Sequence, residues 1–192
     1  MKGLYKNIGN YDTTNLINIV SNQTENDWNK HRFRQETYPV HSSTTTLPIL
    51  FDEQYSRNVG TKSEWYSIYE DEILKIEKQI QSIYKSNGKI LRFVIVNLPA
   101  GKEVARHTDA TKAEEDDMSS LKVDSRIHLP LQTNKDVHFG IGDEVVHMNV
   151  GELWEINNHY HPHWVKNDGS TDRLHCILDY RGDLQYTPIK KR

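Results

Sequence analysis

The sequence has only one cysteine, Cys176, among its 192 residues. A disulfide within the chain is therefore impossible, and this composition favours a reducing compartment, so we expect a cytoplasmic protein. Long apolar runs are also missing. The longest, residues 90–100, is interrupted by Arg92 and Asn97 and is far too short to cross a bilayer. Residues 1–11 lack the apolar core of a signal peptide, so neither secretion nor membrane insertion is expected.

Neither sign of charge dominates the composition. The 24 lysines and arginines are nearly matched by 27 aspartates and glutamates, which gives a formal net charge of −3. Such a chain lacks the basic surplus that binds nucleic acid or an anionic membrane, so we expect neither partner. Histidine, by contrast, is abundant, and eight of the ten histidines lie from His107 onward. Because histidine is the commonest metal ligand, this enrichment hints at a metal site in the second half.

Apolar spacing indicates helices in the first half of the chain. In residues 63–86, tyrosine and isoleucine recur at steps of three and four, which places them on one stripe of an amphipathic helix. Residues 13–21 fit a shorter helix. Residues 44–51 favour a strand, which Pro48 restricts to a short or edge position. We expect the long helix to cover one face of a sheet.

Short strands separated by turns dominate the second half. The segments with strand character are residues 91–98, 125–131, 137–141, 145–150, 153–156, 163–166 and 173–180. This pattern predicts a mainly β sandwich or barrel rather than a parallel α/β sheet. The length suits one domain, with a helical and mixed support at 1–89, a β-barrel core at 90–182 and a tail at 183–192.

His107 and Asp109 are the first candidate metal ligands. Residues i and i+2 on an extended backbone point to the same side, so this imidazole and this carboxylate can share one cation. A third ligand has to come from elsewhere, and His159, His161 and His163 lie together in one later segment. The alternation of side chains along an extended strand puts all three histidines on one face, so it does not identify which of them is the third ligand. Two histidines and one carboxylate leave open positions on an iron, which is typical of non-heme Fe(II) oxygenases.

Arg173, on the last expected strand, is a candidate for binding a carboxylate. Its planar guanidinium fits a carboxylate in a bidentate manner, and a buried arginine needs such a partner. The alternative is a structural ion pair with Asp172 or Asp179. Arg126 and His128 share one face of their strand and could add donors to the same ligand, unless that polar face is turned to water.

Several segments of the second half resemble the aspartyl/asparaginyl β-hydroxylase family. They are residues 92–109, the Ser-Arg-Ile-His-Leu-Pro-Leu run at 125–131, and the stretches 151–158, 163–167 and 172–175. Their order and spacing are far more specific than any single motif. The resemblance implies a double-stranded β-helix, a jelly-roll or cupin-like fold, and the N-terminal helices would pack on one of its sheets.

The resemblance also implies roles for the candidate residues. In that family, the histidine of an H-x-V-x-N run is the distal iron ligand, which corresponds to His163. An arginine shortly after it grips the far carboxylate of 2-oxoglutarate, which corresponds to Arg173. The family's R-x-H strand contributes to the near end of this co-substrate, which corresponds to Arg126 and His128.

The implied activity is that of an Fe(II)- and 2-oxoglutarate-dependent dioxygenase. Co-substrate and O2 bind at the iron, 2-oxoglutarate is converted to succinate and CO2, and an unactivated C–H bond is hydroxylated. Animal members that act on secreted domains have glycine where Asp109 stands, so their substrates are not carried over. We expect a free amino acid, a related small molecule or a peptide residue. Arg32, Arg34 and His41 are candidates for binding a substrate carboxylate, with ordinary surface charge as the alternative.

Two other interpretations stay open. One is a cupin-like metalloenzyme that does not use 2-oxoglutarate, against which Arg173 and the R-x-H strand argue. The other is a catalytically silent binding module, against which the intact set of His107, Asp109 and His163 argues. Residues 110–123, which follow the H-x-D motif and are rich in acids, are either a solvated surface loop or a mobile lid.

Overall fold

A computed structural model describes residues 3–53, 59–109, 125–158 and 161–182. Within these ranges, the helices all belong to the first half of the chain, where the apolar spacing predicts them. They are α1 (Thr14–Val20), α2 (Glu25–Lys30), α3 (Phe33–Thr37), the 3-10 helix η1 (Pro39–His41) and α4 (Tyr66–Tyr84).

Two antiparallel sheets make up the rest of the described structure. The larger sheet has seven strands in the order β1 (Tyr5–Asn10), β9 (Glu152–Ile156), β6 (Ser125–Gln132), β11 (Arg173–Arg181), β4 (Lys89–Leu98), β2 (Thr45–Phe51) and β3 (Thr61–Lys62). The smaller sheet has four, in the order β5 (Glu103–His107), β10 (His163–Asn167), β7 (Val137–Ile141) and β8 (Glu144–Val146).

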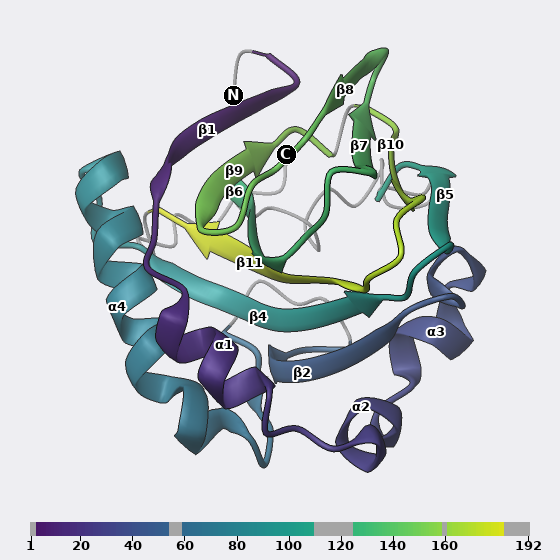
Figure 1. Cartoon of the computed structure of the whole chain (residues 1–192). Helices are drawn as coiled ribbons and strands as arrows, with labels where there is room; N and C mark the ends of the chain where they lie inside the picture. Colours follow the sequence, from purple (N-terminus) through teal and green to yellow (C-terminus); the bar gives the residue numbers. More distant parts are fainter. Residues whose placement is uncertain (1–2, 54–58, 110–124, 159–160, 183–192) are drawn as a thin grey trace, which may run out of the picture.

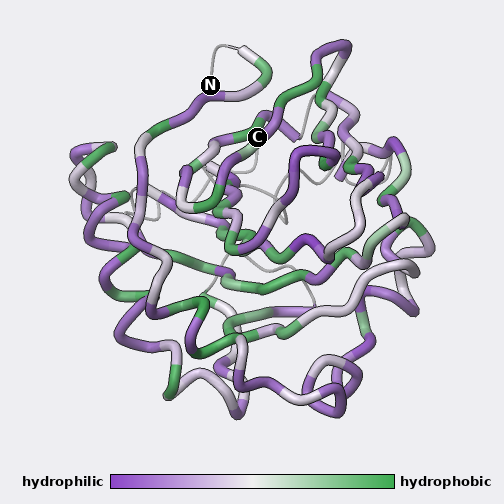
Figure 2. Tube along the Cα trace, viewed as in Figure 1, coloured by the Kyte–Doolittle hydropathy of each residue, from purple (hydrophilic) through white to green (hydrophobic). Residues whose placement is uncertain are grey.

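The large sheet separates two layers of different character (Figure 1). Helices α1 and α4 lie against one of its faces, and the small sheet lies across the other. One apolar core fills the space between the helices and the large sheet, and a second, smaller one lies between the two sheets. In Figure 2 the hydrophobic colour accordingly concentrates on the central strands. This is the double-stranded β-helix with N-terminal helices on one sheet that the sequence predicts.

Helix α4 follows the predicted stripe closely. Tyr69, Ile73, Ile76 and Ile80 are buried against the sheet. The helix ends at Tyr84 because the next residue, the C-cap Lys85, adopts the left-handed conformation with φ 53° and its N–H bonds back to the carbonyl of Gln81. The predicted bounds of 63–86 were therefore two to three residues too wide.

Other boundaries differ from the prediction for local reasons. The strand expected at 145–150 is confined to β8, Glu144–Val146. In β2 the pairing with β4 shifts register between Pro48 and Leu50, because proline has no N–H for the ladder. The first half also contributes strands, since β1, β2 and β3 all belong to the large sheet.

Alternation along β6 and β11 decides what the barrel interior contains. On β11, Cys176 and Leu178 face the core beneath the helices, whereas Arg173, His175 and Asp179 are buried on the opposite face. On β6 the apolar residues likewise face the helices. The polar face of these strands is therefore turned into the barrel rather than to water, and it carries the groups that follow.

The two isoleucines of α4 with opposite exposure test this packing. Ile76 is 0 % exposed and Ile68 is 50 % exposed. We expect Ile76→Ala to lower the free energy of unfolding by about 2–5 kcal/mol, because it leaves a cavity beneath the sheet. Ile68→Ala should change it by less than about 0.5 kcal/mol. Equal unfolding midpoints in urea for the two variants would contradict the assignment of the buried stripe.

Candidate metal centre

The side chains of His107, Asp109 and His163 come together at one end of the small sheet. His107 ends β5, His163 begins β10, and the two residues are direct partners in the antiparallel pairing of these strands. One ligand atom from each of the three residues lies within 4.8 Å of the others, and each imidazole Nε2 is 3.5 Å from Oδ1 of Asp109. Ligand atoms about 2.1 Å from one cation are roughly 3.0–3.5 Å apart, so this donor set fits a single metal ion.

Of the three histidines that alternation left equivalent, the structure places His163 in the ligand cluster. His163 is buried and its ring lies 4.3 Å from that of His107, centroid to centroid. His161 does not join the ligand cluster found among the described residues. His159 lies outside the described residues, as do residues 110–123, the predicted loop or lid.

Hydrogen bonds fix which atom His107 and Asp109 present to the cluster. The Nδ1 of His107 is 2.7 Å from the carbonyl oxygen of Ala105, to which it donates, so the lone pair is on Nε2 and faces the cluster. Oδ2 of Asp109 accepts from Arg126 Nη1 and from the amide of the buried Asn158. Its other oxygen, Oδ1, is consequently the one turned toward both imidazoles.

Arg126 belongs to a row of charges that crosses three strands. Its Nε and Nη2 donate to the two oxygens of Asp179 at 2.7 and 2.9 Å, and Arg92 donates to Asp179 at 3.0 Å. The registers of β6, β11 and β4 place these residues side by side. The role predicted for Arg126 at the co-substrate stays a prediction. In the structure, Arg126 links the metal ligand Asp109 to Asp179 on β11 of the large sheet.

The electrostatics of the site favour a metal at neutral pH. Burial opposes the charge of Asp109, but Arg126 and the two imidazoles outweigh it and hold the pKa of Asp109 well below its usual range. Burial lowers the pKa of His163 to about 4, so this ligand is neutral. Burial also acts against protonation of His107, but hydrogen bonds with Asp109 and Ala105 outweigh it and raise the pKa of His107 above 6.5. A proton at His107 is thus the main competitor of a metal.

A second polar cluster lies deeper in the barrel. Arg173 is only 1 % exposed, and its Nη1 is 2.6 Å from Nδ1 of His175. The ring of His175 stacks on that of His128 at 5.3 Å, and His128 contacts Phe139, which in turn stacks on the metal ligand His163. This chain of rings connects the second cluster with the metal centre.

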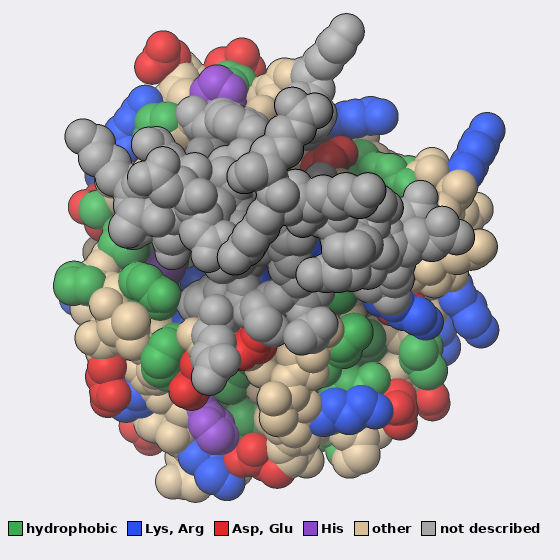
Figure 3. Space-filling view, turned by 180° about the vertical axis from the view of Figure 1, so that it is seen from behind, with side chains coloured by type: hydrophobic (Ala, Val, Ile, Leu, Met, Phe, Trp, Pro, Cys, Tyr) green, Lys and Arg blue, Asp and Glu red, His purple; other side chains and the backbone are tan. Residues whose placement is uncertain are grey.

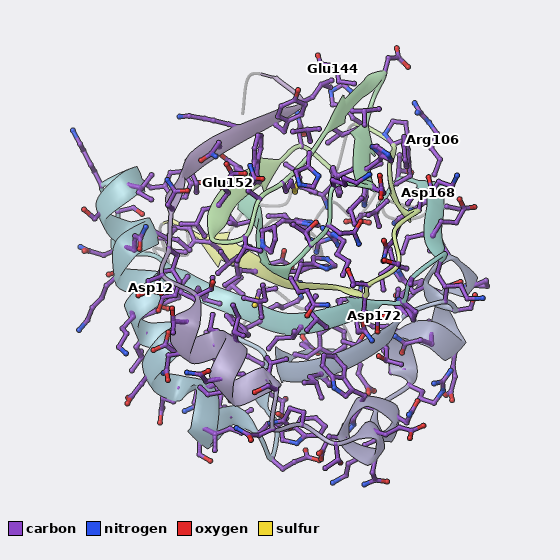
Figure 4. All side chains as sticks on the ribbon, viewed as in Figure 1. Asp12, Arg106, Glu144, Glu152, Asp168 and Asp172 are labelled. Carbon is purple, nitrogen blue, oxygen red and sulfur yellow. The ribbon has the colours of Figure 1, made fainter. Side chains whose placement is uncertain are left out.

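No ion pair joins Arg173 to an acid within the described ranges. Asp172 (labelled in Figure 4), one partner considered in the alternative, accepts instead from the amide of Asn97 and the backbone N–H of Ala100. Asp179, the other, is bound by two different arginines. Burial alone lowers the pKa of Arg173 to about 9, so it is still a cation at pH 7. Burial and this charge hold the pKa of both His128 and His175 well below 6.5, so both rings are neutral.

Two of the three predicted substrate residues lie at a cavity beside the metal ligands. This cavity of about 170 Å³ is lined by Arg34 and His41 together with His107 and Asp109. Nη2 of Arg34 is 3.3 Å from Nε2 of His41, whose ring contacts that of His107 edge-on. Burial and Arg34 lower the pKa of His41 to about 2, so His41 is neutral. Arg32 does not line the cavity and donates to Asn29 at the surface.

Sequence reasoning missed several residues of the site. Arg92 and Asp179 carried a signal, because each is a charge flanked by apolar residues of its strand, at a buried position. His175 also lies at an inward position but had no visible partner in the sequence. Asn158 gave no signal on its own, since its contact with Asp109 joins distant parts of the chain.

Figure 3 shows acidic and basic side chains interspersed over the described part of one face, in line with the balanced composition. Within the described residues, no helix is both long and apolar enough to cross a membrane.

Solved structures share the fold at low sequence identity. A prolyl-4-hydroxylase from Pseudomonas putida matches with a TM-score of 0.55 and 12 % identity over 95 % of this chain and 94 % of its own. A viral collagen prolyl hydroxylase from Paramecium Bursaria Chlorella virus-1, in complex with 2-oxoglutarate, matches with a TM-score of 0.54 and 9 % identity over 95 % and 98 %. A 2-oxoglutarate–Fe(II) oxygenase family oxidoreductase from Burkholderia pseudomallei gives a TM-score of 0.55 and 13 % identity over 73 % and 68 %. A comparison with curated protein sequences finds no match.

A double-stranded β-helix with two histidines and one carboxylate at its mouth defines the class of 2-oxoglutarate-dependent non-heme iron oxygenases. Within this class, the model of the aspartyl/asparaginyl β-hydroxylase family matches residues 17–182. The chain belongs to the aspartyl/asparaginyl β-hydroxylase family, and His107, Asp109 and His163 are its facial triad.

Removal of a ligand should abolish metal binding. We expect His107→Ala and His163→Ala to lose tight Fe(II) binding, because two remaining donors hold a divalent ion poorly. The matched control is His138→Ala, which changes an exposed histidine of β7 outside the cluster and should bind like the wild type. Anaerobic titration calorimetry measures the difference. Wild-type affinity in His107→Ala would contradict the triad.

Metal affinity should also depend on pH in a predictable range. Asp109 stays charged and His163 neutral between pH 5 and 7, so His107 is the triad residue whose proton competes with the metal in this range. Its raised pKa means that protons compete with the metal up to neutral pH. The apparent affinity for Fe(II) should fall by about tenfold for each pH unit below that pKa. A flat profile from pH 5 to 7 would show that His107 is not a ligand.

Proposed function

We propose that the protein binds Fe(II) through His107, Asp109 and His163, binds 2-oxoglutarate through Arg173, and hydroxylates a C–H bond of a small substrate. In the balanced reaction, 2-oxoglutarate, O2 and the substrate give succinate, CO2 and the hydroxylated product. One atom of O2 enters succinate and the other enters the new hydroxyl group. The substrate is an amino acid or a related small molecule, with a residue in a peptide as the competing possibility.

The buried charge of Arg173 is the observation that carries this proposal. A guanidinium at 1 % exposure with two neutral imidazoles beside it and no carboxylate partner in the described residues is costly, because an uncompensated buried charge destabilises a fold by several kcal/mol, about 3–5. A dianionic ligand would supply the missing charge. Its far carboxylate would meet Arg173, while its 2-oxo acid end would chelate the metal.

The chain's own residues would hold and shield the reacting groups. Iron, when bound, supplies the activation of O2 that protein side chains do not provide. Arg126 and Asn158 keep one oxygen of Asp109 on the metal side. The three protein ligands leave positions open for the co-substrate and O2, and the surrounding apolar residues exclude water.

The cavity beside the triad supports a small substrate. Its volume of about 170 Å³ is below the range of about 300–1,000 Å³ that is usual for drug-sized ligands. Arg34 and His41 give one wall a cation and a neutral imidazole, and Val94 and Ile177 give the sheet side apolar contacts. This combination suits an amino acid or a similar acid with a short apolar part.

The first test requires no substrate. Fe(II) and 2-oxoglutarate added to the oxygen-free protein should produce the weak visible charge-transfer band of the chelate, and His107→Ala should abolish it. Tight iron binding without a band would instead support a cupin-like enzyme that does not use 2-oxoglutarate. No iron binding at all would support a binding module without catalysis.

Arg173→Gln should weaken 2-oxoglutarate binding and leave iron binding intact. A hydrogen-bonded charge is worth about 1.5–3 kcal/mol, so we expect the dissociation constant from the band titration to rise by about ten- to a hundredfold. Arg106→Gln is the matched control, because Arg106 lies on the outer side of β5 with its side chain 48 % exposed (Figure 4). An unchanged constant in Arg173→Gln would remove Arg173 from the co-substrate site.

A further inference from the structure

The contact between Arg173 and His175 has a defined direction. Both side chains are buried on the inner face of β11, two residues apart, with Nη1 and Nδ1 separated by 2.6 Å. A guanidinium only donates hydrogen bonds, so Nδ1 of His175 must accept. The proton of this imidazole is therefore on Nε2, and the ring is neutral.

His175 is itself held in place from the neighbouring strand. Its ring stacks on that of His128 from β6, with the planes 19° apart, and the far side of His128 contacts Phe139 at 5.3 Å. Imidazoles stacked in this way have little freedom to rotate. Nδ1 of His175 is therefore held in position to accept from Arg173 before any ligand binds.

We infer that His175 is a positioning residue, which holds one edge of the Arg173 guanidinium so that the other edge is presented to the far carboxylate of 2-oxoglutarate. This inference rests on the function proposed above. Nη1 is occupied by His175, whereas Nη2 is buried and has no hydrogen-bond partner among the described residues. The edge without a partner is the one on which a carboxylate would bind.

Prior positioning affects affinity because arginine has many rotamers. A ligand that must order such a side chain loses part of its binding energy, and a guanidinium fixed in advance spares that loss. We expect the prior positioning of Arg173 to strengthen 2-oxoglutarate binding by about tenfold. His175 touches the arginine and not the metal ligands, so its loss should leave the metal centre unchanged.

The test compares two oxo acids that differ only in the far carboxylate. 2-Oxopentanoate has the chain length of 2-oxoglutarate but ends in a methyl group. Dissociation constants for both are measured from the charge-transfer band of the oxygen-free Fe(II) protein. His175→Leu should weaken 2-oxoglutarate by about tenfold and leave 2-oxopentanoate within about twofold. His175→Asn, whose Oδ1 can replace the Nδ1 acceptor, should restore most of the loss.

Controls separate positioning from general damage. His138→Leu should change neither constant, and the thermal midpoint of each variant without metal shows whether it is folded. If His175→Leu does not fold, His175→Gln takes its place, because glutamine places its acceptor one carbon further out; it should weaken 2-oxoglutarate more than 2-oxopentanoate, while His175→Asn keeps the ratio of the two constants close to that of the wild type. Equal weakening of both oxo acids in His175→Leu or His175→Gln would overturn the positioning role while leaving the function of Arg173 intact. A wild type that shows no band would overturn both.

Discussion

The rest of the site depends on the contacts of the Asp109 carboxylate, because its two oxygens face different partners. Oδ2 is held by Arg126 and Asn158, and Oδ1 faces His107 and His163. Arg126 is anchored in turn by Asp179 on β11, which also binds Arg92 of β4. The orientation of one metal ligand is thus set by the large sheet, although the two histidines belong to the small one.

The buried arginines inside the barrel fall into two groups, according to whether acidic side chains compensate their charge. Around Arg126 and Arg92, the acids Asp109 and Asp179 compensate the charge within the protein. Around Arg173 the described neighbours are neutral rings. A compensated cation stabilises the site itself, whereas an uncompensated one leaves a place for an anion from solution. The same residue type therefore has a structural role at one end of the interior, and the binding role proposed for Arg173 belongs to the other.

The sequence was informative where its signal is local. The spacing of His107 and Asp109 predicts two ligands on one face, and the long apolar stripe predicts α4. Strands β1 and β5 were missed, because short strands with partly exposed faces lack clear alternation. Asn158 and His175 were missed for another reason: their roles come from register and stacking between strands, which only the folded chain brings together.

The direct pairing of His107 with His163 makes the metal a link between β5 and β10. The pairing of these strands shifts register between His163 and Val165, so a local irregularity lies beside the ligand and aims its side chain. A bound ion would close the long chain segment between the two histidines and so restrict its conformational entropy. Metal binding would therefore stabilise the small sheet. The large sheet is stabilised independently by the apolar core that it shares with α4. Without the metal, the end of the barrel that carries the triad would lose its order before the large sheet does.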